Sequence, residues 1–290
     1  MRLFTNPKSM LRDLECNKDL VAEVISTDPK RRKGTFNKEK LVYVKFNRRA
    51  KMARVTSIEW TEMTWNPVTG CVKVSPGCKH CYAETLSKRP KAMGAERYQK
   101  GFQVTTHDDL VDLPKKWKRP RIVFVNSMSD LFQEQVPLNF IRRLFETMRQ
   151  CPQHQFQVLT KRAERLVELS GDLKWSTNIW MGVSIESQEY AYRSKLLRSV
   201  PAAVRFLSVE PLLGEIDRLP LQGIHWVIVG GESGPGARPM KQEWVETIYQ
   251  QCRARGVPFF FKQWGGVQKR RTGRELFGQT FDEMPIAAGA

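Results

Sequence analysis

The sequence predicts an α/β fold in which parallel strands form a complete or partial (β/α) barrel of the TIM type. From Ser57 onward, short runs rich in β-branched and aromatic residues alternate with segments of helical periodicity. Polar side chains also follow most of these runs. A barrel gathers such strand ends around one mouth, whereas a doubly wound sheet spreads them along an edge, so a barrel is favoured.

The expected elements follow one another at regular intervals. A strand is predicted within 57–66, and the run RIVFVNS at 121–127 predicts a second, buried one. Five more strands are expected at 155–162, 178–187, 204–213, 224–234 and 257–266. Helices are expected at 137–151, between the third strand and Leu169, at 188–200 and at 241–255. In the first helix, Phe140, Leu144, Phe145 and Met148 fall on one face.

Length and composition exclude several classes of protein. The 290 residues suffice for one large α/β domain or two ordinary ones, and 41% hydrophobic residues can fill a substantial core. No run approaches about 18 consecutive apolar residues, and the N-terminus lacks the pattern of a secretion signal. We therefore expect no membrane partner and a cytoplasmic location. In that reducing compartment, clustered cysteines favour metal binding or redox catalysis over disulfides.

The net charge of +18 is concentrated near the N-terminus. Residues 1–56 hold 15 Lys and Arg against 6 Asp and Glu, which is half of the excess. Such a charge suits a polyanionic partner, above all nucleic acid, and suits a solvated tail equally well. Ordered-looking sequence begins after Met52. We therefore expect a basic N-terminal extension at 1–51, flexible or arising from an upstream start codon, and a barrel domain at 52–290.

The stretch TGCVKVSPGCKHCYAE, residues 69–84, holds half of the six cysteines. Cys71, Cys78 and Cys81 follow the first predicted strand, which places them at the mouth of the barrel. Three chemistries fit this spacing. A [4Fe–4S] cluster on three cysteines leaves one iron open, a zinc ion would need His80 or a distant cysteine as fourth ligand, and the thiols could be unligated. The scattered thiols, expected to be ordinary, are Cys16, Cys151 and Cys252.

Polar residues follow six of the expected strands. Since the carboxyl ends of parallel strands converge on the active site, these residues are the candidates for binding and catalysis. The glycine-rich run VGGESGPGARP at 229–239 lies at the same edge, and its backbone amides could approach a phosphate, a carboxylate or a ribose. The candidates are Asn126, Ser127, Asp130, Thr160, Lys161, Arg162, Ser184, Glu186, Glu210, Glu232, Ser233, Lys262 and Gln263.

Three cysteines in the loop after the first strand of a parallel barrel resemble the arrangement in radical S-adenosylmethionine (SAM) enzymes. The spacing departs from the usual one, with six residues then two in place of three then two. The stretch from Thr56 to Glu84 is more closely similar to the phage gene-product 37/68 family, also described as three-Cys-motif proteins of phages and bacteria. VNSMSDLF, GVSIES, LSVEPLLG, VIVGGESGPGARP and FFFKQWGG resemble further blocks of that family in the same order. The resemblance runs from about Ser57 to FDEMP at 281–285.

The resemblance implies a radical-SAM-like barrel that binds a [4Fe–4S] cluster through Cys71, Cys78 and Cys81, and SAM through the remaining iron. Reductive cleavage of SAM would then yield a 5′-deoxyadenosyl radical that removes hydrogen from a substrate. The superfamily pattern places His80 near the adenine. Implied partners are an electron donor such as flavodoxin or ferredoxin and a three-Cys-motif partner protein. The expected SAM contacts are Asn126, Ser127 and Asp130 for the amino group, and Ser184 and Glu186 for the ribose.

A nucleotide or nucleic acid is the expected substrate. The strand-end cations would suit phosphate, and Trp65 and Trp264 could stack a base. Two alternatives stay open: a zinc- or cluster-stabilised nucleic-acid-binding protein without catalysis, and a cluster protein that transfers electrons without SAM. The first of these does not account for the polar strand ends. The candidate substrate residues are Lys161, Arg162, Glu210, Glu232, Ser233, Arg238 and Lys262.

Overall fold

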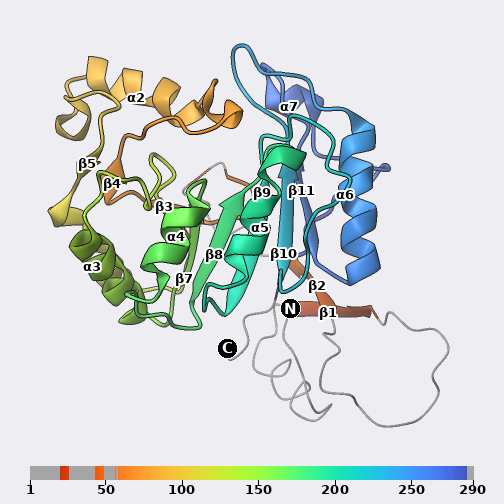
Figure 1. Ribbon diagram of the computed structural model, residues 1–290, viewed down its shortest axis with the longest axis horizontal. Helices are drawn as coiled ribbons and strands as arrows, with labels where there is room; N and C mark the ends of the chain where they lie inside the picture. Colours follow the sequence, from red (N-terminus) through yellow and green to blue (C-terminus); the bar gives the residue numbers. More distant parts are fainter. Residues whose placement is uncertain (1–19, 26–42, 49–55, 57, 286–290) are drawn as a thin grey trace, which may run out of the picture.

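A seven-stranded parallel sheet forms the centre of the computed structural model, which describes residues 20–25, 43–48, 56 and 58–285 (Figure 1). The β-branched and aromatic runs of the sequence form its strands, as their composition predicts. The strands are β3 (Met63–Trp65), β6 (Ile122–Val125), β7 (Gln155–Thr160), β8 (Ile179–Ser184), β9 (Val204–Val209), β10 (Trp226–Gly230) and β11 (Phe259–Gln263).

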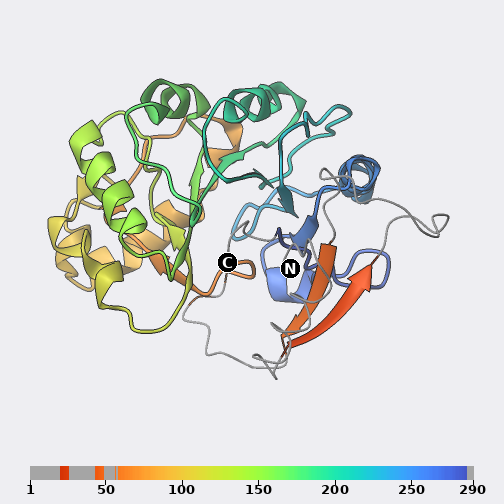
Figure 2. The same ribbon diagram turned by 90° about the horizontal axis from the view of Figure 1, so that it is seen from below.

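The strands of this sheet are neighbours in the order in which they occur along the chain, from β3 at one edge to β11 at the other. A doubly wound sheet would reverse its order at one point, and this one does not. Figure 2 shows the sheet curled into an arc with helices on its outer side. The expectation of parallel strands in a partial barrel is confirmed, and the alternative of a doubly wound sheet is excluded.

Four helices cover the convex face: α3 (Leu138–Arg149), α4 (Ala163–Ser170), α5 (Tyr192–Leu197) and α6 (Gln242–Arg255). All four residues predicted to share one face of α3 are buried in the core. Such a stripe, recurring every three or four positions, is what attaches a helix to a sheet. The helix expected at 188–200 is shorter than predicted, since a 3₁₀ turn (η5, Gln188–Tyr190) precedes α5.

Side chains that alternate along each strand form two separate cores. In β6, Val123 and Val125 face the helices, whereas Phe124 belongs to a second cluster on the concave side of the sheet. This follows from the two-residue period of a strand. The concave cluster consists of Trp60, Phe124, Trp180, Val204, Phe206, Trp226, Ile228 and Phe260. Aromatic rings therefore fill the inside of the half-barrel below the strand ends.

The segment between β3 and β6 carries the cysteines and lies beside one end of the sheet. It contains a short antiparallel pair, β4 (Val68–Thr69) with β5 (Thr105–Thr106). It also contains η1 (Pro76–Cys78), α2 (Tyr82–Ala92), η2 (Glu96–Tyr98), η3 (Asp108–Leu110) and η4 (Leu113–Lys116), and α7 (Lys269–Thr272) follows β11. The first parallel strand is shorter than expected, because residues 59–60 form a turn before it.

Two strands in the predicted basic extension were not expected from the sequence. β1 (Leu20–Ile25) and β2 (Tyr43–Arg48) pair as an antiparallel ribbon. The other residues of the predicted extension at 1–51 lie outside the described residues. None of the described helices has the length and hydropathy needed to span a bilayer.

Candidate functional site

A cavity of about 470 Å³ lies at the carboxyl ends of the parallel strands. Small-molecule sites in proteins span roughly 300–1,000 Å³, so this volume suits a ligand. Each of the seven strands, or the residue directly after it, contributes to the wall. The predicted site residues that line it are Cys71, Cys78, His80, Cys81, Asn126, Ser127, Asp130, Thr160, Lys161, Arg162, Ser184, Glu210, Glu232, Ser233 and Lys262.

The three cysteines reach this cavity from three short structures in a row. Cys71 directly follows β4 and Gly70, Cys78 ends η1, and Cys81 is the residue before the first turn of α2. Burial, together with the charge of Asp130, raises the pKa of Cys71 to about 11, and burial also raises the pKa of Cys81. A thiol that is neutral at pH 7 becomes a thiolate when a metal cation replaces its proton. The raised pKa values make Cys71 and Cys81 poor free nucleophiles and are compatible with metal ligands and with unligated thiols alike.

The described donors do not form a site for a single metal ion. In the described part of the chain, no three His, Cys, Asp or Glu side chains converge closely enough to hold one metal ion. Zinc needs its four ligands on one atom, whereas a [4Fe–4S] cluster takes its cysteines on separate irons. His80, the expected fourth zinc ligand, instead places Nδ1 3.7 Å from Glu232. The three thiols line one cavity, and His80 lies beside Glu232, so His80 does not complete a zinc site with them in this arrangement.

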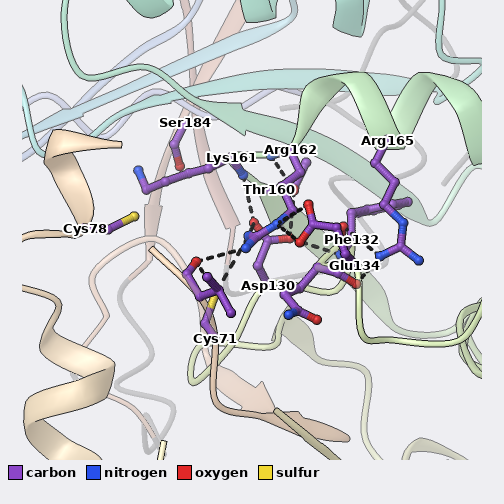
Figure 3. A network of polar contacts seen from close by, with 12 residues as sticks. Cys71, Cys78, Asp130, Phe132, Glu134, Thr160, Lys161, Arg162, Arg165 and Ser184 are labelled. Carbon is purple, nitrogen blue, oxygen red and sulfur yellow. Dashed lines mark hydrogen bonds and ion pairs between the residues drawn. The ribbon is translucent and has the colours of Figure 1, made fainter. Parts of the chain in front are cut away.

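Arg162 ties the first cysteine to the sheet. Figure 3 shows its side chain reaching from the end of β7 between Cys71 and Asp130. Its Nη1 lies 3.1 Å from Asp130 and 3.7 Å from Sγ of Cys71, and its Nη2 donates to the carbonyl of Val72 at 2.9 Å. Nε donates to Glu134 as well. A planar guanidinium with several fixed donors can hold all these groups at once, which a lysine cannot.

Asp130 already has a full set of hydrogen-bond partners. Its oxygens accept from the hydroxyl of Thr160 at 2.7 Å, from the backbone N–H groups of Phe132 and Lys161, and from Arg162. A carboxylate offers about four lone-pair sites, so none is left for the amino group of a ligand. The hydrogen bonds of Asp130 therefore do not favour the expected contact with SAM. Asp130 instead positions Arg162 and the end of β7.

Glu186 anchors the second cysteine. It is 1% exposed and lies behind Gly77, which lines the cavity. Its carboxylate accepts from Ser75 at 2.7 Å, from Lys161 at 2.6 Å and from Arg193 at 2.9 Å. Burial alone would raise the pKa of Glu186, but Lys161 and Arg193 hold that pKa below its ordinary value. An ionised Glu186 therefore clamps the turn that carries Cys78 onto β8.

The glycine-rich run is clamped to the cysteine loop in a similar way. Arg238 donates to Glu232 from its backbone N–H and guanidinium, and its Nη2 donates to the carbonyl of Pro76 at 2.9 Å. Gly236 has a φ of 77°, and a methyl group there would lie 2.8 Å from the ring of His80. Only glycine allows this approach. The two loops that frame the mouth are thus fastened to each other.

Each Lys or Arg that lines the cavity is paired with a carboxylate. Lys161 pairs with Glu186, Arg162 with Asp130, Lys262 with Glu210 at 2.5 Å, and Lys269 with Glu59 at 2.9 Å. Arg238, behind the wall, pairs with Glu232. These cations were expected to bind phosphate, and that expectation is not supported, because a phosphate would have to displace a carboxylate from each of them.

The aromatic residues expected to stack a base are placed elsewhere. Trp65 is 1% exposed in the convex core, and its Nε1 donates to the carbonyl of Leu110. Trp264 packs on Phe261 and does not line the cavity. The rings that do line it are Trp60, Phe102 and Phe124, together with Tyr82 and His80.

Several residues of the site were not predicted, among them Trp60, Ser75, Gly77, Phe124, Arg193 and Ser208. The period of two residues would have revealed one of them. Ser208 lies two positions before Glu210 and therefore shares a face with a residue already singled out.

Asn126 is one of the strand-end residues with a polar atom that has no partner among the described residues, the others being Ser233 at Oγ and Gln263 at Oε1. Its backbone has a φ of 60°, its Oδ1 accepts from the N–H of Val68, and its side chain is 3% exposed. Its buried Nδ2 has no hydrogen-bond partner among the described residues. The free atom is a donor, which suits an acceptor on a ligand and not the ammonium group expected here. Non-glycine residues in this conformation are uncommon and gather at functional sites.

Comparison with known proteins gives one match. The model of a family described as "Protein of unknown function (DUF5131)" matches residues 55–285. No curated protein and no solved structure matches the chain. The matched range begins after the basic extension and contains every residue of the cavity wall.

Proposed function

We propose a function for this chain, which belongs to the family of proteins of unknown function DUF5131: it is a radical SAM enzyme. In this proposal Cys71, Cys78 and Cys81 hold a [4Fe–4S] cluster, and the half-barrel is of the TIM-related type found in radical SAM enzymes. The observation that carries the proposal is that one loop, following the first parallel strand, brings all three thiols into the cavity at the strand ends.

The chemistry of the donor set supports the same proposal. All three cysteines are partly buried, and the described residues offer no additional cysteine at the cavity. Three thiolates leave one of four irons without a protein ligand, so that iron can take a small molecule. When bound, the cluster supplies the electron that cleaves SAM into a reactive radical. The resemblance of the motif blocks to three-Cys-motif proteins belongs to the same proposal.

In this proposal the residues of the chain itself fix the position of the loop that carries the three cysteines. Arg162 holds the Cys71 end of the loop through the carbonyl of Val72, and its guanidinium beside Sγ favours the thiolate. Glu186 holds the Cys78 end through Ser75. Both clamps are buried ion-pair networks, which keep a geometry fixed when every partner is satisfied. The aromatic cluster below the cavity keeps water out of the half-barrel.

SAM is proposed to lie against the strand ends next to the cysteines. Ser127 and Ser184 line the cavity and offer hydroxyl groups, and His80 lies at its rim between Glu232 and Gly236. Glu186 is engaged by three partners behind the wall, so it supports this surface and does not contact the ribose. An electron donor such as flavodoxin or ferredoxin, and the reducing cytoplasm as location, belong to the proposal.

Cysteine variants test the proposal directly. Cys71→Ala, Cys78→Ala and Cys81→Ala, each purified without oxygen, are expected to lose iron and acid-labile sulfide. Cys151→Ala is the matched control, because this thiol is buried in the convex core and does not line the cavity. Cys151→Ala should keep the iron and sulfide content of the wild-type protein. Full iron and sulfide in Cys78→Ala would show that the ligand assignment is wrong, and one zinc without iron in the wild type would favour a zinc-stabilised binding protein.

A further inference from the structure

The floor of the cavity is formed by two aromatic rings and one amide. The rings of Trp60 and Phe124 have centroids 4.7 Å apart and are tilted by 58°. Asn126 follows the last residue of β6 directly and, like Phe124, borders the cavity. All three residues line the cavity although each is at most 6% exposed. We call them the floor subsite.

Two buried hydrogen-bond donors of this floor subsite are unused. Neither Nε1 of Trp60 nor Nδ2 of Asn126 has a partner in the described part of the chain. An indole N–H can only donate, and the orientation of the Asn126 amide is set by the N–H of Val68, which its Oδ1 accepts. A buried donor without a partner costs about 1–3 kcal/mol, and at the wall of a cavity an acceptor on a ligand can remove that cost.

The charges around the cavity restrict that ligand further. The four lining cations are each paired with a carboxylate, so the wall has no unpaired positive charge to offer a phosphate. A ligand of the floor subsite is therefore neutral, flat enough to lie against aromatic rings, and equipped with acceptors at its edge. Nucleobases have this combination: every base carries ring-nitrogen or carbonyl acceptors and a face that stacks.

We propose that the floor subsite binds a nucleobase, which makes the base moiety of a nucleoside, nucleotide or nucleic acid the substrate of this protein. Phe124 and Trp60 contact the ring, and Trp60 Nε1 and Asn126 Nδ2 donate to its edge. Any phosphate of the substrate stays outside the cavity, in contrast to the phosphate contacts expected from the strand-end cations. This inference rests on the proposed function, since it names the substrate on which that chemistry acts.

Calorimetric titration of the anaerobically purified protein tests the binding of a nucleobase. Saturating SAM is present and no reductant is added, so that the SAM site is filled and no turnover occurs. The four ribonucleosides are titrated one by one, and ribose 5-phosphate is the matched probe that has the phosphate and lacks the base. We expect at least one nucleoside to bind and ribose 5-phosphate not to bind. Equal binding of ribose 5-phosphate, or no binding of any nucleoside, would overturn the inference.

Three variants locate the binding. Trp60→Phe replaces the indole by a smaller aromatic ring and removes the donor, and Asn126→Gly removes the amide while permitting the positive φ. Each should weaken nucleoside binding by about tenfold, the effect of one buried hydrogen bond. Trp180→Phe is the control, because its Nε1 is also buried and unpartnered in the same aromatic cluster, yet Trp180 does not line the cavity. Equal weakening by Trp180→Phe would show that the effect is structural and would refute the subsite.

Iron, sulfide and the response to SAM are measured on the same preparation, so that the two proposals can fail separately. A protein with a SAM-responsive cluster and no nucleoside binding refutes the nucleobase subsite alone. A protein without iron that binds a nucleoside refutes the radical SAM function alone. Binding of adenosine only, and only when SAM is left out, would assign the floor subsite to SAM itself and overturn the inference.

Discussion

Replacing Gly77 by alanine tests whether the turn that carries Cys78 must pack directly against Glu186. A methyl group at this position would lie 2.5 Å from Cγ and 2.7 Å from Oε1 of Glu186. Glu186 cannot yield easily, because Ser75, Lys161 and Arg193 hold its carboxylate. The turn must therefore move, and Cys78 moves with it.

The expected cost is that of overpacking a buried contact, about 2 kcal/mol in the free energy of unfolding. For a domain of this size such a loss lowers the melting temperature by about 4–8 °C. Iron content after anaerobic purification should fall as well, since one ligand is displaced. Differential scanning calorimetry measures the first effect and iron and sulfide analysis the second.

Gly171→Ala is the matched control, because Gly171 has a φ of −69° and no atom lies within 4 Å of the added methyl group. It should leave both the melting temperature and the iron content at or above the wild-type values. The contact is identified by a double-mutant cycle, in which Gly77→Ala costs less when Glu186→Ala has already removed the opposing atoms. A Gly77→Ala protein with wild-type melting temperature and full iron would refute the packing contact, and equal costs in the two backgrounds would place the clash elsewhere.

Three further predictions concern the supports of the site and of the fold. Arg162→Met leaves Asp130 buried without its cation, so the free energy of unfolding measured in urea should fall by about 3 kcal/mol; an unchanged value would show that the ion pair does not stabilise the loop. Burial, together with the nearby Arg205, lowers the pKa of His225 from 6.5 to about 4. The contribution of neutral His225 to the free energy of unfolding is therefore complete above pH 6.5 and is lost as the pH falls toward 4. Between pH 7 and pH 5 this loss should be about 1 kcal/mol after allowance for partial exposure, and His225→Asn, which keeps an acceptor for the N–H of Arg205, should not show it. Deletion of residues 1–51 should leave the melting temperature and iron content unchanged, and a loss of folded protein would show that the extension belongs to the domain.

The sequence predicted the parallel sheet because its strands have local signals. Runs such as IVFV and WVIVG are rich in β-branched and aromatic residues, and the helices between them have a single apolar stripe. The order of the strands followed from the same alternation, since a strand–helix–strand unit returns beside its predecessor. The first strand, at 63–65, was predicted too long, because Trp60 has a strand-like composition but packs inside the half-barrel from a turn.

The sequence predicted which residues meet at the candidate site, but not the ion pairs that they form. The strand-end rule brought Lys161, Arg162 and Lys262 to one cavity, as the structure shows. It could not reveal that each of them is neutralised by a carboxylate from another element, because sequence position does not show which side chains meet across a mouth. The floor subsite was missed for a related reason: Phe124 resembles any core residue of a buried strand, and only the fold shows that it lies beneath Asn126.

The most direct test of the proposed function is electron paramagnetic resonance of the anaerobically purified, reduced wild-type protein, recorded with and without SAM and accompanied by iron and sulfide analysis. About four irons per chain and a signal that shifts when SAM is added would establish a cluster with one open iron. One zinc per chain, no iron and no response to SAM would contradict the radical SAM function and leave a zinc-stabilised binding protein as the better explanation of the three cysteines.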